Sequence, residues 1–353
     1  MIIFGIIYFA ICFWGLKMSQ KENGIITDFM SIDKTLSVKG IFVMLILIHH
    51  AFGFCPPQTI ADTWLYEFKC FFGQLVVVMF MFYSGFGLMH SITKKGKSYI
   101  DTIPSNRVLK LICDMVLVVL LYLPFSIYTG QIHSVKQIAL SFFGYSNVGN
   151  YNWYIYTIIW AYLLTYIAFQ ICKNRPYIAA VTVTVLCGIY IIVMHQAKPN
   201  EYYWCDTLIC YPMGIWFSLL WEKHIKPLLT KHIAVWYLLF IPTLAVFLWV
   251  HSMSGRFIYA VLRAVFFCVV AVMITMKISF NNAVLRFFGR NIFGIYIFQK
   301  MFFVLFETLG IVDISPALYF GLCAGCTIGI TVVFNKISAY LNPMSKKFIL
   351  YKS

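Results

Sequence analysis

The sequence predicts an all-α polytopic bundle of about 10–11 transmembrane helices, and three observations lead to this fold class. Of the 353 residues, 61% are hydrophobic and only 11% are charged, whereas soluble domains carry about 25% charged residues. Apolar stretches of about 17–25 residues, the length that crosses a bilayer core of roughly 30 Å, recur along the chain. Lysine and arginine concentrate in alternate loops between these stretches. The chain is therefore expected to be integral to a membrane.

Eleven apolar stretches can be interpreted as membrane spans, and the second and seventh of them are the least apolar. The stretches lie at 1–16, 36–54, 70–90, 106–128, 152–172, 177–195, 204–221, 233–251, 257–276, 289–312 and 315–341. The first one has no basic residue before its apolar run and no small-residue cleavage site. We therefore interpret it as a retained helix and not as a signal peptide.

The positive charges predict the orientation of the bundle, because lysine and arginine in short loops stay on the cytoplasmic side. The loops assigned to the outside hold few basic residues. Those assigned to the cytoplasm carry Lys17, Lys21, Lys34, Lys94, Lys95, Lys97, Lys173, Arg175, Lys223, Lys226, Lys231, Lys277, Arg286, Lys346, Lys347 and Lys352. This alternation predicts that the N-terminus lies outside and the C-terminus lies in the cytoplasm.

The formal net charge of +15 does not indicate a nucleic-acid-binding protein, because the basic residues are spread over many loops instead of forming one stripe. No stretch outside the spans is large enough to fold by itself, so any chemistry must be done by the bundle. The eleven cysteines lie mostly within spans. Cys323 and Cys326 have CxxC spacing but lie in an apolar helix, so we expect no metal site.

Ionisable residues at membrane depth are costly and usually functional, and His50 is the first candidate. Eleven residues separate it from Lys39, so at about 100° per residue the two share a helix face, roughly 16 Å apart along the axis. His49 points about 100° away. A neutral imidazole can take a proton from a hydroxyl group, as general-base catalysis requires. The alternative is a histidine that only packs between helices.

Three further polar groups at membrane depth have simpler explanations. Asp114 follows Arg107 and Lys110 on nearly the same helix face, which predicts an intrahelical pairing. Lys300 and Glu307 are seven residues apart on one helix, so we expect them to pair across two turns with help from water or another span.

Arg263 stands alone in its span. We expect it to satisfy backbone carbonyls or Glu307; the alternative is a cation in a tunnel for an acceptor substrate.

Five motifs occur in a fixed order and together resemble those of one family. They are Lys39 with a ten-residue gap before His50; Tyr83-Ser84-Gly85-Phe86; Arg107-Val108-Leu109-Lys110 after Pro104; Asn152-Trp153-Tyr154; and Phe288-Gly289-Arg290-Asn291 followed by Gly294-Ile295-Tyr296-Ile297-Phe298-Gln299. In this order they resemble the motifs of the acyltransferase family 3 membrane domain, which comprises O-acetyltransferases of bacterial surface polysaccharides. Gln299 stands where the family often has histidine, and Lys110 replaces an arginine, which keeps the charge but loses bidentate phosphate geometry.

The resemblance covers residues 34–345 and leaves 1–16 as an extra N-terminal transmembrane helix beyond the family's usual ten. It implies an integral membrane O-acyltransferase of the bacterial cytoplasmic membrane. The enzyme would move an acyl group, most often acetyl, from cytoplasmic acyl-CoA to a hydroxyl of a cell-surface glycan or lipid-linked sugar. Acyl-CoA would be a co-substrate, and no bound cofactor is expected. Nothing in the sequence indicates the oligomeric state.

The resemblance also assigns roles to residues. His50 would act as the base or relay the acyl group covalently, with Lys39 and His49 beside it in a catalytic group. Lys39, Arg107 and Lys110 are placed for the phosphates of the donor, and the Ser84-Gly85 pair would let another backbone or the acyl arm approach closely. Plain helix packing is the alternative for that pair. The acceptor or accessory positions are Trp153, Tyr154, Tyr296, Gln299 and Arg263, although Trp153 and Tyr154 also suit an aromatic belt at the membrane interface.

A transporter, polysaccharide polymerase or flippase is the alternative function. A transporter favours inverted repeats with paired broken helices, and the two halves of this chain show no convincing similarity. A polymerase is expected to expose a large, basic outer loop. The longest outer loop, 129–151, carries only Lys136 and His133 as basic residues.

Overall fold

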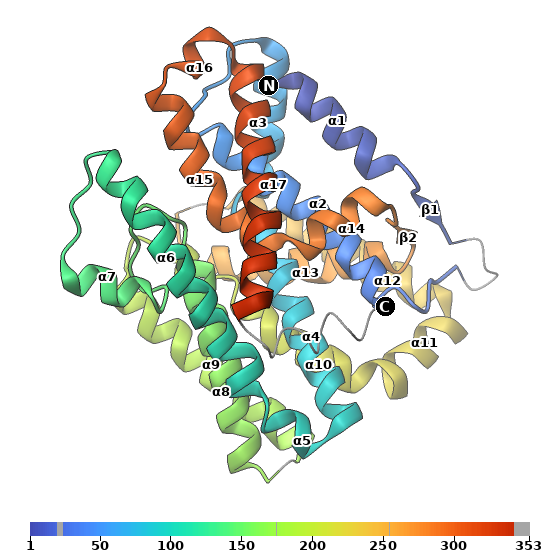
Figure 1. Ribbon diagram of the computed structural model, residues 1–353. Coiled ribbons are helices and arrows are strands. Elements are labelled where there is room, and N and C mark those ends of the chain that lie inside the picture. Colours follow the sequence, from blue (N-terminus) through green and yellow to red (C-terminus); the bar gives the residue numbers. More distant parts are fainter. Residues whose placement is uncertain (20–23, 174, 254, 342–353) are drawn as a thin grey trace.

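The computed structural model describes residues 1–19, 24–173, 175–253 and 255–341 and is built almost entirely of helices (Figure 1). The helices are α1 (Ile2–Phe13), α2 (Ile32–Ala51), α3 (Ile60–Phe72), α4 (Val78–Lys95), α5 (Lys97–Ile100), α6 (Lys110–Tyr128), α7 (Val135–Ser141), α8 (Trp153–Ile171), α9 (Pro176–Ala197), α10 (Cys210–Leu220), α11 (Lys226–Lys231), α12 (Ile233–Ser252), α13 (Phe257–Thr275), α14 (Ala283–Arg290), α15 (Ile292–Thr308), α16 (Ile311–Ile314) and α17 (Pro316–Leu341). Two short strands, β1 (Lys17–Met18) and β2 (Ile278–Ser279), pair antiparallel with Lys17 opposite Ser279.

The predicted all-α membrane bundle is confirmed. By length and composition, seven helical runs of the described chain can each cross a membrane: Ile60–Lys95, Lys97–Tyr128, Trp153–Ile171, Pro176–Ala197, Ile233–Ser252, Phe257–Thr275 and Pro316–Leu341. The other predicted spans fall on α1, α2, α10 and α15. The count of ten or eleven spans stays a prediction.

The helix in the first predicted span is shorter than the apolar stretch 1–16. Helix α1 has 12 residues, which makes it about 18 Å long, well short of a bilayer core of roughly 30 Å. The chain is extended at Trp14 and turns at Gly15, whose φ of 75° favours glycine. It then enters β1, so the stretch 1–16 is a short helix followed by a turn.

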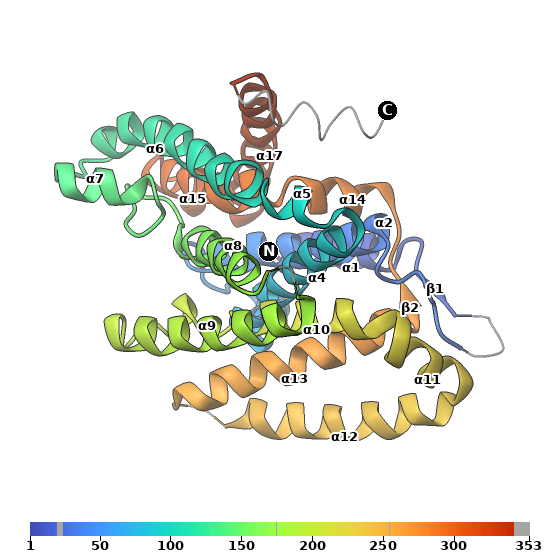
Figure 2. The same ribbon diagram turned by 90° about the horizontal axis from the view of Figure 1, so that it is seen from below.

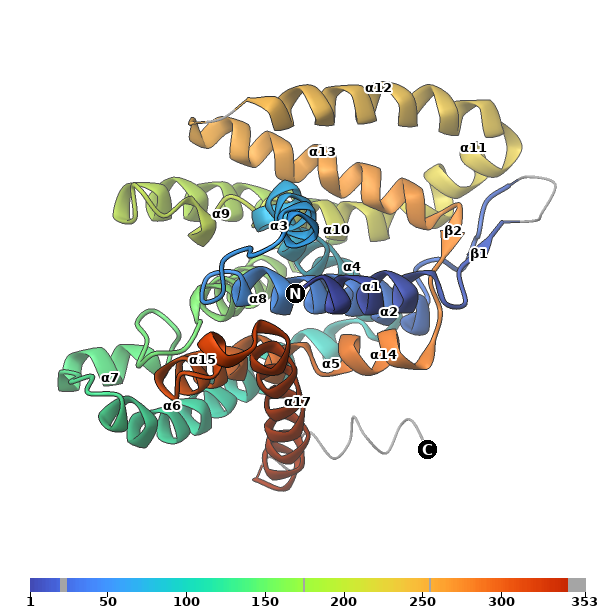
Figure 3. The same cartoon turned by 90° about the horizontal axis from the view of Figure 1, so that it is seen from above.

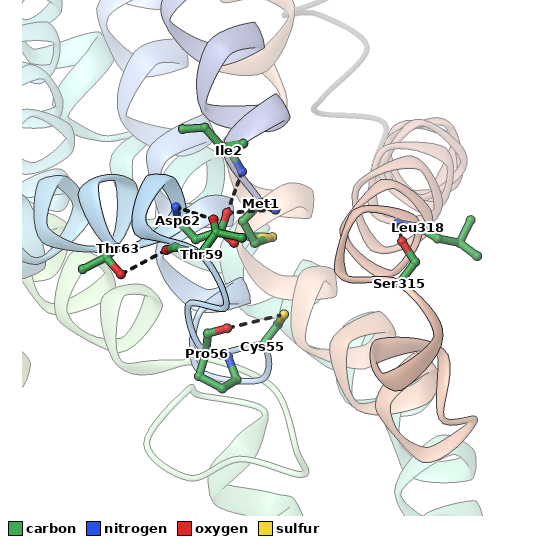
Figure 4. A network of polar contacts seen from close by, with 9 residues as sticks. All are labelled: Met1, Ile2, Cys55, Pro56, Thr59, Asp62, Thr63, Ser315 and Leu318. Atoms are coloured by element: carbon green, nitrogen blue, oxygen red, sulfur yellow. Dashed lines mark hydrogen bonds and ion pairs between the residues drawn. The ribbon is translucent and has the colours of Figure 1, made fainter.

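Helix α1 is nevertheless fastened at both ends. At its start, the Oδ1 atom of Asp62 in α3 accepts the backbone N–H of Ile2 at 2.8 Å and lies 3.1 Å from the amine of Met1 (Figure 4). At its end, the side-chain amide of Asn282 donates to the carbonyls of Ile11 and Trp14, at 2.9 and 2.8 Å. These contacts tie α1 to α3 and to the start of α14.

The bundle has two distinct ends. In Figures 2 and 3, α7 and the α12–α13 connection lie at one end, and α11 with the β1–β2 ribbon lies at the other. We refer to these as the α7 end and the α11 end. Both views also place α12 and α17 on opposite flanks. Helix α2 is central, because every side chain from Phe42 to Ile48 is buried, as expected of a helix that is apolar all round.

Helix α2 is held by a reciprocal glycine contact with α14. A Cβ atom added at Gly40 would lie 2.0 Å from the carbonyl oxygen of Leu285, and one added at Gly289 would lie 1.9 Å from the carbonyl oxygen of Leu36. The two backbones therefore touch directly, as small residues allow between helices in membranes. This contact sets the position of α2 along α14.

A second reciprocal contact joins α4 and α10. A Cβ atom at Gly85 would lie 2.0 Å from the carbonyl oxygen of Tyr211, and one at Gly214 would lie 2.1 Å from that of Phe82. The predicted close approach at Gly85 is therefore an approach of another helix backbone. This supports the packing interpretation of that glycine.

We predict that Gly40→Ala lowers the thermal stability of the purified protein, because the new methyl group meets the Leu285 carbonyl and the helices must separate. Overpacking of this kind costs about 1–3 kcal/mol. The measurement is the midpoint of thermal unfolding in detergent. The matched control is Gly325→Ala in α17, where an added Cβ has no atom within 4 Å and the midpoint is expected to stay or rise. Equal midpoints for both variants would contradict the role of the contact.

Candidate functional site

His50 lies in the last turn of α2 and stacks on the ring of Tyr151. The ring centroids are 4.1 Å apart and the planes are inclined by 25°. His49, its neighbour in sequence, turns toward Lys69 of α3, as the 100° offset predicted. The central, buried helix α2 thus delivers one imidazole to a position covered by an aromatic ring.

Tyr151 belongs to a loop whose own hydrogen bonds fix its shape. The side-chain amide of Asn152 donates to the carbonyls of Gly144 and Ser146, at 2.8 and 2.6 Å. The hydroxyl of Ser126 in α6 donates to the carbonyl of Val148, which is fully buried. The loop is thus attached to α6, and α8 begins at Trp153, two residues after Tyr151. Because these bonds anchor the loop, the stacked ring is positioned before any ligand arrives.

Helix α15 supplies the other side of the site through Tyr296, Gln299 and Lys300. Their spacing puts them on one helix face. The ring of Tyr296 lies 6.0 Å from that of Tyr151, and the ammonium of Lys300 lies 5.2 Å from the same ring. The side-chain amide of Gln299 lies beside His50 and interacts with it, and it donates to the carbonyl of Tyr296 at 3.0 Å.

Several buried polar atoms of this site have no hydrogen-bond partner within the described part of the chain. They are Nδ1 of His49, Nδ1 of His50, the hydroxyl of Tyr296 and Oε1 of Gln299. A buried polar atom left unpaired costs about 1–3 kcal/mol, so most such atoms in proteins are paired. Their concentration around His50 favours a site for a polar ligand.

Arg107 lies in a π-helical turn, Pro104–Leu109, between α5 and α6, and α5 lies nearer to the α11 end than α7 does (Figure 2). Its guanidinium donates to the hydroxyl of Tyr99 at 3.0 and 3.3 Å and lies 5.9 Å from the ring of Tyr162 in α8. The tyrosines hold the guanidinium in one orientation. A positioned guanidinium is suited to a phosphate group.

Helix α4 presents a face of small residues, one of which contacts the tyrosines of the site. Ser84, Gly87 and Ser91 share one half-buried face of α4, and a Cβ atom added at Gly87 would have no atom within 4 Å. The Ser84 hydroxyl is a polar partner of Tyr154, whose ring lies 6.1 Å from Tyr296. Ser84 thus connects α4 to Tyr154, and Tyr154 in turn contacts Tyr296.

Lys110 does not join Arg107 in one cluster. Its ammonium pairs with Asp114 at 2.6 Å, and the same carboxylate accepts the hydroxyl of Ser338 in α17 at 2.5 Å. The predicted pairing of Lys110 with Asp114 is confirmed. Lys39 is half-buried one position before Gly40, where α2 meets α14, and so lies away from the ring cluster around His50.

The remaining candidates separate into an inward and an outward group. Tyr154 faces Tyr296 inside the bundle, whereas Trp153 contacts Tyr203, with ring centroids 5.8 Å apart. This placement supports the interface interpretation for Trp153 and the site interpretation for Tyr154.

Arg263 has a different environment from the one expected. Its charge acts on Asp206, before α10, and on His251 in α12. Across the described residues, no ion pair joins Glu307 to Arg263 or to Lys300, so neither residue pairs with Glu307 directly. Glu307 is exposed, and Lys300 turns instead to Tyr151.

Sequence reasoning did not include Tyr151 and Lys300 among the site residues. Each lies directly beside a motif that was considered: Tyr151 precedes Asn152-Trp153-Tyr154, and Lys300 follows Gln299. Lys300 was visible as an intramembrane cation but was assigned to Glu307. Within the described residues, no group of three His, Cys, Asp or Glu side chains could hold a metal ion.

Comparison with known families gives a match over most of the chain. A family model described as an acyltransferase domain, acyltransferase family 3, matches residues 37–336. The match begins in α2 and ends in α17, so it includes His50, Arg107 and Tyr296, whereas α1 lies before it. No curated protein and no solved structure matches the chain. With its apolar helices and this match over most of its length, the chain belongs to acyltransferase family 3 and is a membrane O-acyltransferase.

Proposed function

We propose that the protein transfers an acyl group, expected to be acetyl, from cytoplasmic acyl-CoA to a hydroxyl of a cell-surface glycan or lipid-linked sugar. The observation that carries this proposal is the position of His50. It is a histidine at membrane depth, stacked on Tyr151, with an Nδ1 atom that has no hydrogen-bond partner among the described residues. An imidazole with a free nitrogen can accept the proton of an attacking hydroxyl.

The proposed reaction is a direct acyl transfer. His50 takes the proton of the sugar hydroxyl, and the oxygen attacks the thioester carbonyl carbon. The carbon–sulfur bond then breaks, and the leaving thiolate takes the proton from the imidazolium, giving an ester and free CoA. The hydroxyl of Tyr296, which lies beside the backbone of Tyr154, is suited to donate to the oxyanion. In the alternative sequence, His50 carries the acyl group covalently between the two substrates.

Arg107 is our proposed contact for a phosphate of the donor. Its guanidinium is oriented by Tyr99 and Tyr162. Lys110 contributes less, because Asp114 already balances its charge.

We also propose that the protein lies in the bacterial cytoplasmic membrane with its α11 end in the cytoplasm. The basic loops assigned to the cytoplasm include residues of α11 and of the β1–β2 ribbon, which lie together at that end (Figure 2). Acyl-CoA would then reach Arg107 from the cytoplasm, and the acceptor would reach His50 from the α7 end.

The orientation predicts the behaviour of reporter fusions at the C-terminus. Green fluorescent protein fused there should fluoresce, because it folds in the cytoplasm, whereas alkaline phosphatase fused there should be inactive, because it needs the oxidising compartment. Fluorescence and phosphatase activity of whole cells are the measurements. The reverse pattern would exclude a cytoplasmic C-terminus.

For the base assignment, we predict that His50→Ala lowers acyl transfer by about 10²–10⁴-fold, the usual contribution of a positioned proton acceptor. Transfer of labelled acetyl from acetyl-CoA, catalysed by protein reconstituted in vesicles, is the measurement.

A matched control is His195→Ala. His195 stacks on Phe257 with ring centroids 4.1 Å apart, so the change removes a similarly stacked imidazole away from the site, and transfer should stay near the wild-type rate. If His50→Ala keeps wild-type turnover, His50 is not the base.

For the donor site, we predict that Arg107→Met weakens binding of CoA by about 10-fold or more, because a charge-assisted hydrogen bond contributes about 1.5–3 kcal/mol. Lys110→Met should weaken it much less, since Asp114 neutralises that ammonium. Isothermal titration of the purified protein with CoA checks both values. An unchanged CoA affinity in a folded Arg107→Met protein would remove the phosphate assignment.

A further inference from the structure

Lys300 is a half-buried cation that has no carboxylate partner among the described residues. Its ammonium lies over the ring of Tyr151 at 5.2 Å. An attractive contact with the aromatic face recovers part of the hydration that a buried ammonium loses, but it supplies no countercharge. Cations inside membrane proteins usually pair with an anion or serve a function. The one acidic residue on the same helix, Glu307, is exposed to the surroundings.

The position of Lys300 assigns it to the α7 end of the site. Helix α14 lies toward the α11 end, and α15 continues from it toward α7 (Figure 3). Lys300 is therefore farther along this direction than Tyr296 and Gln299. Tyr151, on which the ammonium rests, belongs to the loop between α7 and α8. Arg107, the proposed donor contact, lies in the turn between α5 and α6, away from the α7 end. The two cations would therefore contact different parts of the bound substrates.

The surroundings of Lys300 match a polyhydroxylated ligand with one negative charge. Gln299 is fully buried and Tyr296 is almost so, with exposed fractions of 0% and 4%. Among the described residues, no hydrogen bond is made by the Oε1 atom of Gln299, the hydroxyl of Tyr296 or the Nδ1 atom of His50, so these atoms can bond sugar hydroxyls. Lys300 offers up to three N–H donors and a full charge to an anion.

We propose that Lys300 and Tyr151 form an anion-binding site next to His50, and that the acceptor carries a carboxylate or phosphate close to the hydroxyl that is acylated. This inference rests on the proposed function, because it concerns the acceptor side of the same site. The anion restores charge balance at Lys300 and places the sugar so that one hydroxyl meets the imidazole. A neutral acceptor lacks this anchor.

The test compares binding of charged and neutral sugars that are otherwise similar. The probes are octyl glucoside, octyl glucuronide, which carries a carboxylate, and octyl glucoside 6-phosphate, which carries a phosphate. Their affinities for the purified protein are measured by isothermal titration in a neutral detergent. We expect the wild-type protein to bind at least one charged sugar about 10-fold more tightly than the neutral one. The two charged arms show whether the anion is a carboxylate or a phosphate.

Variants assign this preference to Lys300. Lys300→Met should reduce the ratio of charged to neutral affinity to nearly one, and Lys300→Arg should retain most of it. The matched control is Lys277→Met. Lys277 is also half-buried over aromatic rings, 4.9 Å from Trp236 and 5.0 Å from Tyr237, but it lies beside β2 at the α11 end. This control should keep the wild-type ratio.

Three results would overturn the proposal: equal binding of charged and neutral sugars by the wild-type protein, an unchanged ratio in Lys300→Met, or equal losses for all three sugars. The last result would make Lys300 a structural or oxyanion-stabilising residue. Because binding is measured without turnover, the outcome is separate from that of the proposed function. If the protein shows a charge preference that depends on Lys300 but catalyses no acyl transfer, only the proposed reaction is rejected. If it catalyses acyl transfer but shows no such preference, only the anion site is rejected.

Discussion

The direct backbone contact between α2 and α14 is the constraint on which the rest of the site depends. Lipid gives helices no hydrophobic reason to associate, so their positions are set by close packing. Gly40 and Gly289 let the two backbones touch, and this places α2 at a fixed height in the bundle. His50 lies ten residues after Gly40 on the same helix, so its level in the bundle is fixed by the same contact. Gly85 and Gly214 allow a similar backbone contact between α4 and α10. Helix α4 carries Ser84, the polar partner of Tyr154.

Around this frame, the site combines aromatic rings with unsatisfied polar atoms. Tyr151 stacks on His50, and the rings of Tyr296 and Tyr154 follow in a chain of aromatic contacts. Tyrosine rings combine apolar surface with a hydroxyl that can make polar contacts. The imidazole and the Gln299 carboxamide keep free nitrogen and oxygen atoms. Such atoms lower stability, and in folded proteins they are concentrated where a ligand bonds to them. Stability and function thus oppose each other at this position.

The sequence was sufficient for the class of protein but not for all of the charge partners. Long apolar stretches with charges confined to loops require a helix bundle, because backbone polar groups in lipid must be satisfied within each helix. The pairing of Lys110 with Asp114 was equally accessible, since residues four apart on a helix are neighbours wherever that helix lies. Helical spacing also suggested that Lys300 pairs with Glu307. The two do not pair directly, because Tyr151, 149 positions earlier in the chain, occupies the space beside the ammonium.

By itself, the sequence determined the membrane bundle, the helix face shared by Lys39 and His50, and the ordered motifs of acyltransferase family 3. These depend on composition and on spacing within single helices, which are local quantities. The tertiary structure decided that Tyr151 covers His50, that Lys110 and Arg107 have separate environments, and that Lys300 joins the site. It also decided that Gly85 meets a helix backbone. Each of these is a contact between segments distant in the chain, and such contacts are set by how whole helices pack and not by the pattern within any one of them.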